Sequence, residues 1–380
     1  MLSVEAVAPI KEISDLIKEN GGASFQFCYQ CGICDVVCPW NRVRQFSMRK
    51  LVRQATFGLT EIEQEDIWRC TTCGTCPPRC PRGVKQIELG ISLRRIATEY
   101  GAFPDSVKPI ITVSDSLMAE GNPFNMERAK RADWAEGLSV KTFAEGMEIL
   151  YFPGCYLSYD PRLKKVAAAT ARILDKAGVD FGILGSKESC CAESIRKTGN
   201  EPLFKRLARE NIKAFIDHGV KKILVSSPHC LHTFKNEYPE FNVHFEVVHI
   251  SQFLSELIDD GRLQPAREYE KKITWHDPCY LGRHNGIFDA PREVLGSISE
   301  LVEMEGYREN SFCCGGGGGR IWMETPKAER FADLRLKQAV DVGAEVLVTA
   351  CPYCITNFTD SSLGQNIEVK DITEVVQEVL

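Results

Sequence analysis

The chain has no run of eighteen apolar residues, so it offers no segment that could cross a bilayer as a helix. Its N-terminus, MLSVEAVAPIKEISDLIKEN, is acidic and amphipathic and lacks the basic-then-apolar order of a signal peptide. The charge excess is small, since a net charge of −6 over 380 residues gives no basic footprint for nucleic acid. These absences predict a cytoplasmic protein with no transmembrane segment of its own, which could still lie at a membrane through a partner.

Two nucleotide-binding motifs are also missing. No GxGxxG joins an expected strand to an expected helix, so no dinucleotide or flavin site is predicted. The glycine run Gly315–Gly319 is not a phosphate loop, because it lacks a following Gly-Lys-Ser/Thr and comes directly after two cysteines. Electrons would therefore have to reach this chain from another subunit that can split a hydride.

Cysteine, in contrast, is abundant, with 17 residues. Disulfide frameworks are typical of small secreted chains, whereas this chain is long and its cysteine count is odd. Metal ligation is therefore favoured over disulfides. A length of 380 residues fits two or three domains, each with its own core.

Two cysteine runs near the N-terminus share one spacing. CYQCGICDVVCPW and CTTCGTCPPRCPR both follow the bacterial ferredoxin pattern C-x2-C-x2-C-x3-C-P, and the second repeats the first 42 residues later (70 − 28 = 42). In two-cluster ferredoxins the fourth cysteine of each run binds the other cluster. On that rule the chain holds two 4Fe-4S cubane clusters, one bound by Cys28, Cys31, Cys34 and Cys80 and the other by Cys70, Cys73, Cys76 and Cys38. Zinc sites are the alternative, but zinc takes cysteines in pairs and each run crowds three onto one turn.

The segments around these runs predict helices at residues 1–20, 42–57 and 87–100. The middle one is basic, and its charges form either a surface for an acidic redox partner or a solvated helix face. These charges are carried by Arg42, Arg44, Arg49, Lys50 and Arg53. Residues 101–147 carry scattered proline and glycine and are expected to form a connector packed on the cluster domain.

From residue 148 onward, short β-branched runs alternate with helical segments, which is typical of α/β units with a parallel sheet. Each cysteine group lies at the end of an expected strand or in the next loop, where ligands bind in open α/β sheets. The order then repeats: EILYFPGC, KESCCAE and VKKILVSSPHC return as KKITWHDPC, ENSFCCG and AEVLVTACPYC. The lags are 279 − 155 = 124, 313 − 190 = 123 and 354 − 230 = 124, which predicts a duplicated domain.

The predicted fold class is therefore α+β multidomain. Residues 1–147 form a helical, two-cluster ferredoxin-like domain, and residues 148–268 and 269–380 form two duplicated α/β domains, each with a short parallel sheet.

The two copies differ in their cysteines. The first offers Cys155, Cys190, Cys191 and Cys230, whereas the second offers Cys279, Cys313, Cys314, Cys351 and Cys354. Ser227 stands where the second copy has Cys351. Vicinal thiolates can bind a soft metal centre, and glycines allow backbone to come close to it. The second copy is therefore predicted to hold a metal cluster, while occupancy of the first stays open.

Histidines lie close to these cysteines and are further candidates. His276 beside Cys279, and His229 and His232 around Cys230, could transfer protons or bind metal. Loop histidines near a cluster also serve as hydrogen-bond donors to its ligands. His276 is the candidate for a catalytic proton-transfer role.

The complete pattern resembles heterodisulfide reductase. The run CTTCGTCPPRCPRGV is similar to the small iron-sulfur C subunit, and the duplicated region resembles the CCG domains of the catalytic B or D subunit. The chain thus looks like a natural C-B fusion of the D-subunit type. The resemblance implies a noncubane 4Fe-4S cluster, at which a disulfide is cleaved one electron at a time, on Cys279, Cys313, Cys314, Cys351 and Cys354. The first motif departs from that catalytic pattern at Ser227.

The resemblance also implies partners. These are a flavin-containing subunit, either heterodisulfide reductase A-like or a dehydrogenase, and further redox subunits. The architecture is similar, too, to subunits of anaerobic glycerol-3-phosphate dehydrogenase and of glycolate or lactate oxidation systems. Two functions follow. The chain is an oxidoreductase subunit for disulfide or thiol chemistry, or a non-catalytic conduit between a flavoprotein and quinone, ferredoxin or another reductase.

Overall fold

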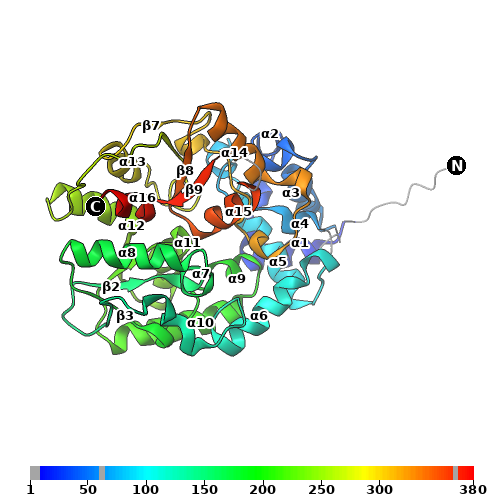
Figure 1. Ribbon diagram of the computed structural model, residues 1–380. Coiled ribbons are helices and arrows are strands. Elements are labelled where there is room, and N and C mark those ends of the chain that lie inside the picture. Colours follow the sequence, from blue (N-terminus) through cyan, green and yellow to red (C-terminus); the bar gives the residue numbers. More distant parts are fainter. Residues whose placement is uncertain (1–8, 60–64, 363–366) are drawn as a thin grey trace. The chain divides into compact units, whose positions relative to one another are not determined.

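The computed structural model describes residues 9–59, 65–362 and 367–380, in helices and short strands (Figure 1). The chain divides into two compact units. The first unit combines the N-terminal residues up to Ile111 with two later segments, Ser194–Glu201 and Gly317–Glu329. The second unit contains Thr112–Glu193, Pro202–Gly316 and Arg330–Leu380. No helix in the described ranges is long and apolar enough to cross a membrane.

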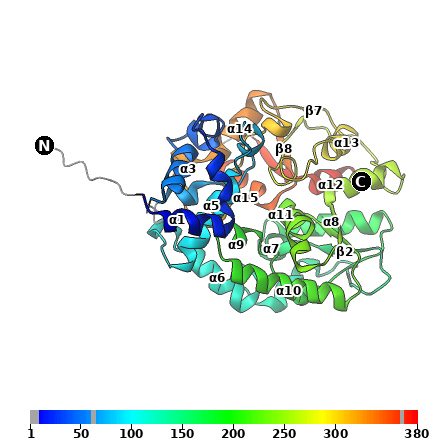
Figure 2. The same ribbon diagram turned by 180° about the vertical axis from the view of Figure 1, so that it is seen from behind.

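The first unit is helical wherever it is described. Its longer helices α1, α3 and α5 pack against one another (Figure 2), around buried aromatic residues that include Phe25, Trp40 and Trp68. Its elements up to Ile111 are α1 (Lys11–Ile17), η1 (Lys18–Gly22), η2 (Ala23–Phe27), α2 (Ile33–Val36), η3 (Pro39–Arg42), α3 (Met48–Phe57), α4 (Asp66–Arg69), η4 (Pro77–Arg79), α5 (Gln86–Glu99) and η5 (Asp105–Val107). The later segments add η11 (Arg320–Trp322) and η12 (Lys327–Glu329).

Two of the three helices predicted near the N-terminus are present. Helix α5 confirms the prediction for 87–100, and the helix predicted for 1–20 is present from Lys11 onward. Residues 1–8 lie outside the described part of the chain. The prediction for 42–57 is wrong over its first residues, because the Asn41 side chain bonds both the N–H and the carbonyl of Phe46 and turns the chain there. Helix α3 begins only at Met48, where the Ser47 hydroxyl accepts the Lys50 N–H at 3.0 Å and caps it.

The second unit contains two parallel sheets of corresponding strand order. The first runs in the order β1 (Lys141–Thr142), β3 (Phe181–Ile183), β2 (Ile149–Phe152), β4 (Lys222–Val225) and β5 (Glu246–His249). The second runs in the order β7 (Leu301–Val302), β6 (Ile273–Trp275), β8 (Val346–Thr349) and β9 (Glu368–Asp371). Leu150 pairs with Ile223 in one sheet, and the residues 124 positions later, Thr274 and Leu347, pair in the other. The duplication and the α+β multidomain fold class are thus confirmed.

Helices cover these sheets and pack across the two copies: α8 packs against α16, and α12 against α13. The central strands β2 and β8 are buried throughout, as expected for parallel strands covered on both faces. The remaining helices and turns are α6 (Pro109–Glu120), η6 (Arg128–Ala135), α7 (Gly154–Tyr159), α8 (Lys164–Lys176), η7 (Gly185–Lys187), α9 (Glu193–Lys197), α10 (Glu201–Asp217), α11 (Pro228–His232), η8 (Thr233–Glu237), η9 (Tyr238–Phe241), α12 (Ile250–Asp259), α13 (Ala290–Gly296), η10 (Arg308–Asn310), α14 (Phe331–Asp341), α15 (Pro352–Ser362) and α16 (Ile372–Val379).

The segment expected to be a connector on the cluster domain belongs instead, from Thr112, to the second unit. The reason is that β1 adds to the first sheet through Lys141 opposite Gly182, while η6 packs on α7 and α8. Sequence patterns missed both, because β1 has only two residues and η6 is a 3-10 helix without helical periodicity. The domain limits at 147 and 268 stay a prediction.

The N-cap of α16 offers a stability test. The Asp371 carboxylate accepts the Thr373 N–H at 2.9 Å, and the Glu374 side chain accepts the Asp371 N–H, which forms a capping box. Asp371→Ala should therefore cost about 1 kcal/mol and lower the unfolding temperature in a calorimetric scan. Asp371→Asn should retain most of this stability, since its side-chain oxygen can still cap the helix. Equal unfolding temperatures for Asp371→Ala and the wild type would contradict this role.

Candidate metal centres

The two N-terminal cysteine runs lie together in the first unit. Cys38, the fourth cysteine of the first run, lines one cavity with three cysteines of the second, Cys70, Cys73 and Cys76, and Cys34 of the first run lines it too. In the other direction, η4, which ends at Arg79 just before Cys80, packs against α2, which carries Cys34. The two runs thus lie against each other, as a crossed ligand pattern needs, and the assignment of individual cysteines to each cluster remains a proposal.

The chemistry of these thiols fits a cationic iron–sulfur core. Burial, Asp35 and the neighbouring Cys28 raise the pKa of the Cys34 thiol to about 12. Burial and the thiolates of Cys73 and Cys70 likewise raise the pKa of Cys38. A bound cation would remove this repulsion, and metal ligation requires deprotonated thiols.

Backbone amides already point at two of these sulfur atoms. The Gln30 N–H donates to Cys28 Sγ at 3.4 Å, and the Val84 N–H donates to Cys80 Sγ at 3.3 Å. Such bonds stabilise charge on the sulfur ligands of an iron–sulfur cluster and tune its potential.

The five predicted cysteines of the second copy converge in the second unit. Cys279 lies in the loop after β6, the vicinal pair precedes the glycine run, and Cys351 and Cys354 follow β8. The Sγ atoms of Cys314 and Cys354 are 3.2 Å apart. All five cysteines are between 1% and 8% exposed. The structure thus brings together every sulfur that the sequence assigned to this site.

Local bonds fix the vicinal pair. The Gly315 N–H donates to Cys313 Sγ at 3.3 Å, with Gly315 in the left-handed region at φ 96°. The Asn357 side-chain amide donates to the Cys314 carbonyl at 3.0 Å. The pair is therefore held by the start of the glycine run on one side and by α15 on the other.

His276 lies at the same site. Its ring is buried, and one of its nitrogens lies within 4.8 Å of the sulfur atoms of Cys314 and Cys354. The Arg335 guanidinium donates to His276 Nδ1 at 3.3 Å. Burial and the Arg335 charge hold the pKa of His276 well below its usual range. The ring is therefore neutral. Because Nδ1 accepts from Arg335, the ring proton lies on Nε2, which is left as a hydrogen-bond donor. Its proton-transfer role remains a proposal.

The four cysteines of the first copy also converge, around a cavity that Ser227 lines with them. Cys191 Sγ and Cys230 Sγ lie 3.3 Å apart, and the Ala192 N–H donates to Cys190 Sγ at 3.4 Å. Ala192 occupies the position of Gly315 and shares its left-handed backbone, at φ 66°. The first site thus keeps the geometry of the second although it lacks one cysteine.

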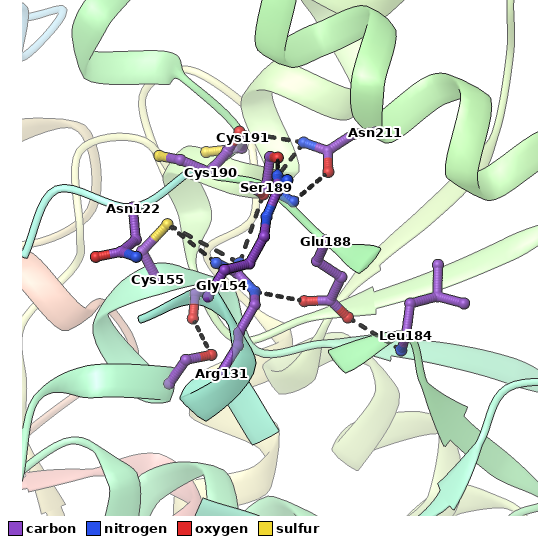
Figure 3. A network of polar contacts seen from close by, with 12 residues as sticks. Asn122, Arg131, Gly154, Cys155, Leu184, Glu188, Ser189, Cys190, Cys191 and Asn211 are labelled. Atoms are coloured by element: carbon purple, nitrogen blue, oxygen red, sulfur yellow. Dashed lines mark hydrogen bonds and ion pairs between the residues drawn. The ribbon is translucent and has the colours of Figure 1, made fainter. Parts of the chain in front are cut away.

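A buried ion pair that no sequence motif indicated adjoins this first site. Figure 3 shows Arg131 between Cys155 and Glu188. Its Nη1 and Nη2 lie 3.8 Å and 3.9 Å from Cys155 Sγ, and its Nε lies 3.2 Å from the Glu188 carboxylate. Arg131 is 1% exposed. It was missed because it lies on η6, in the segment expected to be a connector.

Aromatic rings join the two copies. The His229 ring lies 4.2 Å from Tyr280 and 4.4 Å from Tyr353, and Tyr353 lies 4.8 Å from Tyr156. His229 and Tyr353 are equivalent positions, as are Tyr156 and Tyr280 (353 − 229 = 280 − 156 = 124). Tyr353 lines the first site's cavity. Each copy thus places the residue before its last cysteine against the other copy.

His229 also acts on a cysteine of the second site. Burial alone would raise the pKa of Cys351, but hydrogen bonding with Cys354 and with His229 lowers it to about 5. His229 Nδ1 lies 3.0 Å from the Glu193 carboxylate. The second site is thus completed by a residue of the first copy.

The second half of the glycine run contacts the ferredoxin-type loop within the first unit. A Cβ on Gly317 would lie 2.3 Å from the Thr71 carbonyl oxygen, and one on Gly318 would lie 2.5 Å from the Cys70 carbonyl oxygen. The buried Arg94 donates to the carbonyls of Cys70 and Gly318 at 2.7 Å and 2.9 Å. These glycines therefore serve close backbone packing beside Cys70, whereas the sequence suggested a role only at the CCG cysteines.

Comparison with known proteins agrees with this architecture. The family model described as a cysteine-rich domain, CCG, matches residues 149–235 and 273–359, and that of a 4Fe-4S dicluster domain matches 24–84. A probable iron-sulfur-binding oxidoreductase, FadF, of Bacillus subtilis is 40% identical, with 84% of this chain and 46% of the relative covered. EtfAB:quinone oxidoreductase of Syntrophomonas wolfei is 35% identical, with 84% and 47% covered. The chain thus spans about half the length of these two relatives.

A third relative is matched over almost its whole length. The D subunit of dihydromethanophenazine:CoB–CoM heterodisulfide reductase from Methanosarcina mazei is 34% identical, and 93% of each chain is covered. A crystal structure of a hypothetical protein from Helicobacter pylori covers 97% of this chain and 72% of its own, with a TM-score of 0.51 and 10% identity, which shows a shared fold alone.

The dicluster domain and the two cysteine-rich domains define an iron–sulfur oxidoreductase. Electron transfer through bound iron–sulfur clusters is the activity that this class of protein shares. The chain belongs to the family of CCG-domain iron–sulfur oxidoreductases that includes the D subunit of heterodisulfide reductase.

Proposed function

We propose that this chain is the iron–sulfur subunit of a heterodisulfide reductase-like complex that performs disulfide or thiol redox chemistry. The two ferredoxin-type sites hold 4Fe-4S cubane clusters, and the C-terminal CCG site holds a noncubane 4Fe-4S cluster. A flavin-containing subunit, either heterodisulfide reductase A-like or a dehydrogenase, exchanges electrons with the chain.

One observation carries this proposal: five buried cysteines converge at the C-terminal site, whereas a cubane cluster needs only four. The five comprise a vicinal pair and Cys279, Cys351 and Cys354. The extra thiolate supports a cluster of another type at this site. The first copy, which has Ser227 in place of the fifth cysteine, lacks this feature.

The surrounding residues can support disulfide chemistry. Reduction breaks one S–S bond and takes up two electrons and two protons. Iron–sulfur clusters, when bound, would supply the electrons singly. Arg335 donates to His276 Nδ1 and so leaves the ring's own proton on Nε2 as a hydrogen-bond donor at this site, while the Asn357 amide orients Cys314. Thiolate charge at the site would thereby be stabilised.

A second candidate is a non-catalytic conduit towards quinone, ferredoxin or another reductase. It is favoured by the burial of all five cysteines, none of which is more than 8% exposed. Similarity to an EtfAB:quinone oxidoreductase also supports it. In this case the C-terminal cluster would only pass electrons on.

A thiol-dependent paramagnetic signal separates the two functions. We expect the oxidised, anaerobically purified chain to show a new EPR signal when a small thiol is added, because the thiolate binds at the C-terminal site. Cys354→Ser should abolish it, and Cys230→Ser, the equivalent change in the first copy, should leave it unchanged. A chain that contains all its clusters but gives no thiol-dependent signal would leave the conduit as the function.

A further inference from the structure

The two ferredoxin-type sites differ in their exposure. Cys31 in the first run is exposed, and Cys28 and Cys34 are partly exposed. In the second run no cysteine is exposed: Cys73 is buried, with the neighbouring Thr71 and Thr72, and the other three are partly exposed. The glycine run packs beside this second loop. Electron transfer requires the two redox centres to come close. The more exposed first run therefore allows an external redox protein a closer approach than the second run does.

Exposed apolar side chains surround the first run. Val36 is 81% exposed, Tyr29 59% and Phe27 57%, and all three lie within ten residues of Cys31. Phe57, at the end of α3, and Ile33 are exposed as well. Single exposed apolar residues are ordinary, but a group around one functional loop marks an interaction site.

A basic groove adjoins these residues. It has a volume of about 540 Å³ and is lined by Cys28, Gln30, Ser47, Arg49, Lys50, Arg53, Thr56 and Phe57. Helix α3 (MRKLVRQATF) carries three positive charges and no acidic residue. The acidic side chain nearby, Asp35, is bonded by the Ser47 hydroxyl at 2.7 Å and by the Arg49 N–H at 2.9 Å. Among the residues that line the groove, three are cations, Arg49, Lys50 and Arg53, and none is acidic. Arg42, a few residues before α3, is exposed as well.

We propose that these residues form the docking surface for an acidic electron-transfer protein, which exchanges single electrons with the cluster of the first run. This first-run face comprises Phe27, Tyr29, Ile33, Val36, Arg42, Arg49, Lys50, Arg53 and Phe57. The inference rests on the proposed function, since it needs a cluster at Cys28, Cys31 and Cys34. Charge complementarity selects the partner: the chain is acidic overall, at −6, yet basic at this face.

The test uses flavodoxin hydroquinone as an acidic probe that loses one electron while the chain gains it. The full chain is purified anaerobically, and its reduction is followed by stopped-flow absorbance at low ionic strength. The triple variant Arg49→Glu, Lys50→Glu, Arg53→Glu should react at least about tenfold more slowly, and added salt should slow the wild type but not the variant.

A matched control places the same charge change elsewhere. Lys165, Arg172 and Lys205 are exposed on α8 and α10 of the second unit, and their replacement by Glu should leave the flavodoxin rate within about twofold, because the steering field is local. Both triple variants should keep the iron content and the dithionite-reducible absorbance of the wild type, which shows that they fold and bind clusters.

Three outcomes would overturn the proposal. Equal flavodoxin rates for the wild type and the α3 variant would do so directly. Loss of binding to anionic phospholipid vesicles in the α3 variant, with an unchanged flavodoxin rate, would make this face a membrane contact. A wild-type chain with no dithionite-reducible iron would contradict the proposed function itself, and the docking surface with it.

Discussion

Replacing Cys314 with serine is expected to remove about four iron atoms per chain, one cluster, and to leave the two ferredoxin-type clusters in place. Cys314 is 5% exposed, and its sulfur lies 3.2 Å from that of Cys354. A serine hydroxyl is a poor ligand for this soft metal centre. To replace the thiolate it would have to lose its proton, and a buried alkoxide is energetically costly. Iron and acid-labile sulfide analysis measures the loss, and EPR of the reduced protein shows which signals remain.

Cys191→Ser is the matched control, because Cys191 holds the equivalent position in the first copy (314 − 191 = 123). It should leave the thiol-dependent signal of the C-terminal site unchanged. Full iron content in Cys314→Ser, with the C-terminal signal retained, would show that this cysteine is not a ligand.

Gly317→Ala is expected to disrupt the loop that holds the second run of ferredoxin-type cysteines. The added Cβ would lie 2.3 Å from the Thr71 carbonyl oxygen, and a backbone atom cannot move aside as a flexible side chain does. We expect the unfolding temperature to fall by roughly 5–10 °C, which corresponds to about 2 kcal/mol in a domain of this size.

Gly90→Ala provides the control in the same unit. Gly90 lies within α5, and a Cβ there meets nothing within 4 Å, so alanine should raise helix stability by up to about 1 kcal/mol. A Gly317→Ala chain as stable as the wild type would mean that the loop can shift freely, and the packing role of the glycine run would then be wrong.

The fold could be predicted where the signal was local or periodic. The ferredoxin-type runs and the repeat at a lag of 124 residues are such signals, and the two sheets of corresponding strand order confirm the duplication. The helix predicted for 42–57 was wrong over its first residues, because the Asn41 side chain bonds the backbone of Phe46 and turns the chain there. Spacing cannot reveal a turn that depends on a single side chain.

The candidate sites could be predicted only as far as their cysteines. Arg131 lies 24 residues before Cys155, in a stretch without a motif, and only folding brings it to the thiol. His229 was noticed for its neighbour Cys230, yet it acts on Cys351 of the other copy. Such contacts depend on how the copies pack, which a linear pattern does not contain.

Iron–sulfur clusters at the ferredoxin-type and C-terminal sites are what every proposal for this chain depends on. The most direct measurement is metal and acid-labile sulfide analysis of the anaerobically purified chain, combined with EPR. We expect at least about twelve iron atoms per chain with matching sulfide, since each 4Fe-4S cluster contains four of each. Zinc at the cysteine sites, with no iron and no sulfide, would contradict it.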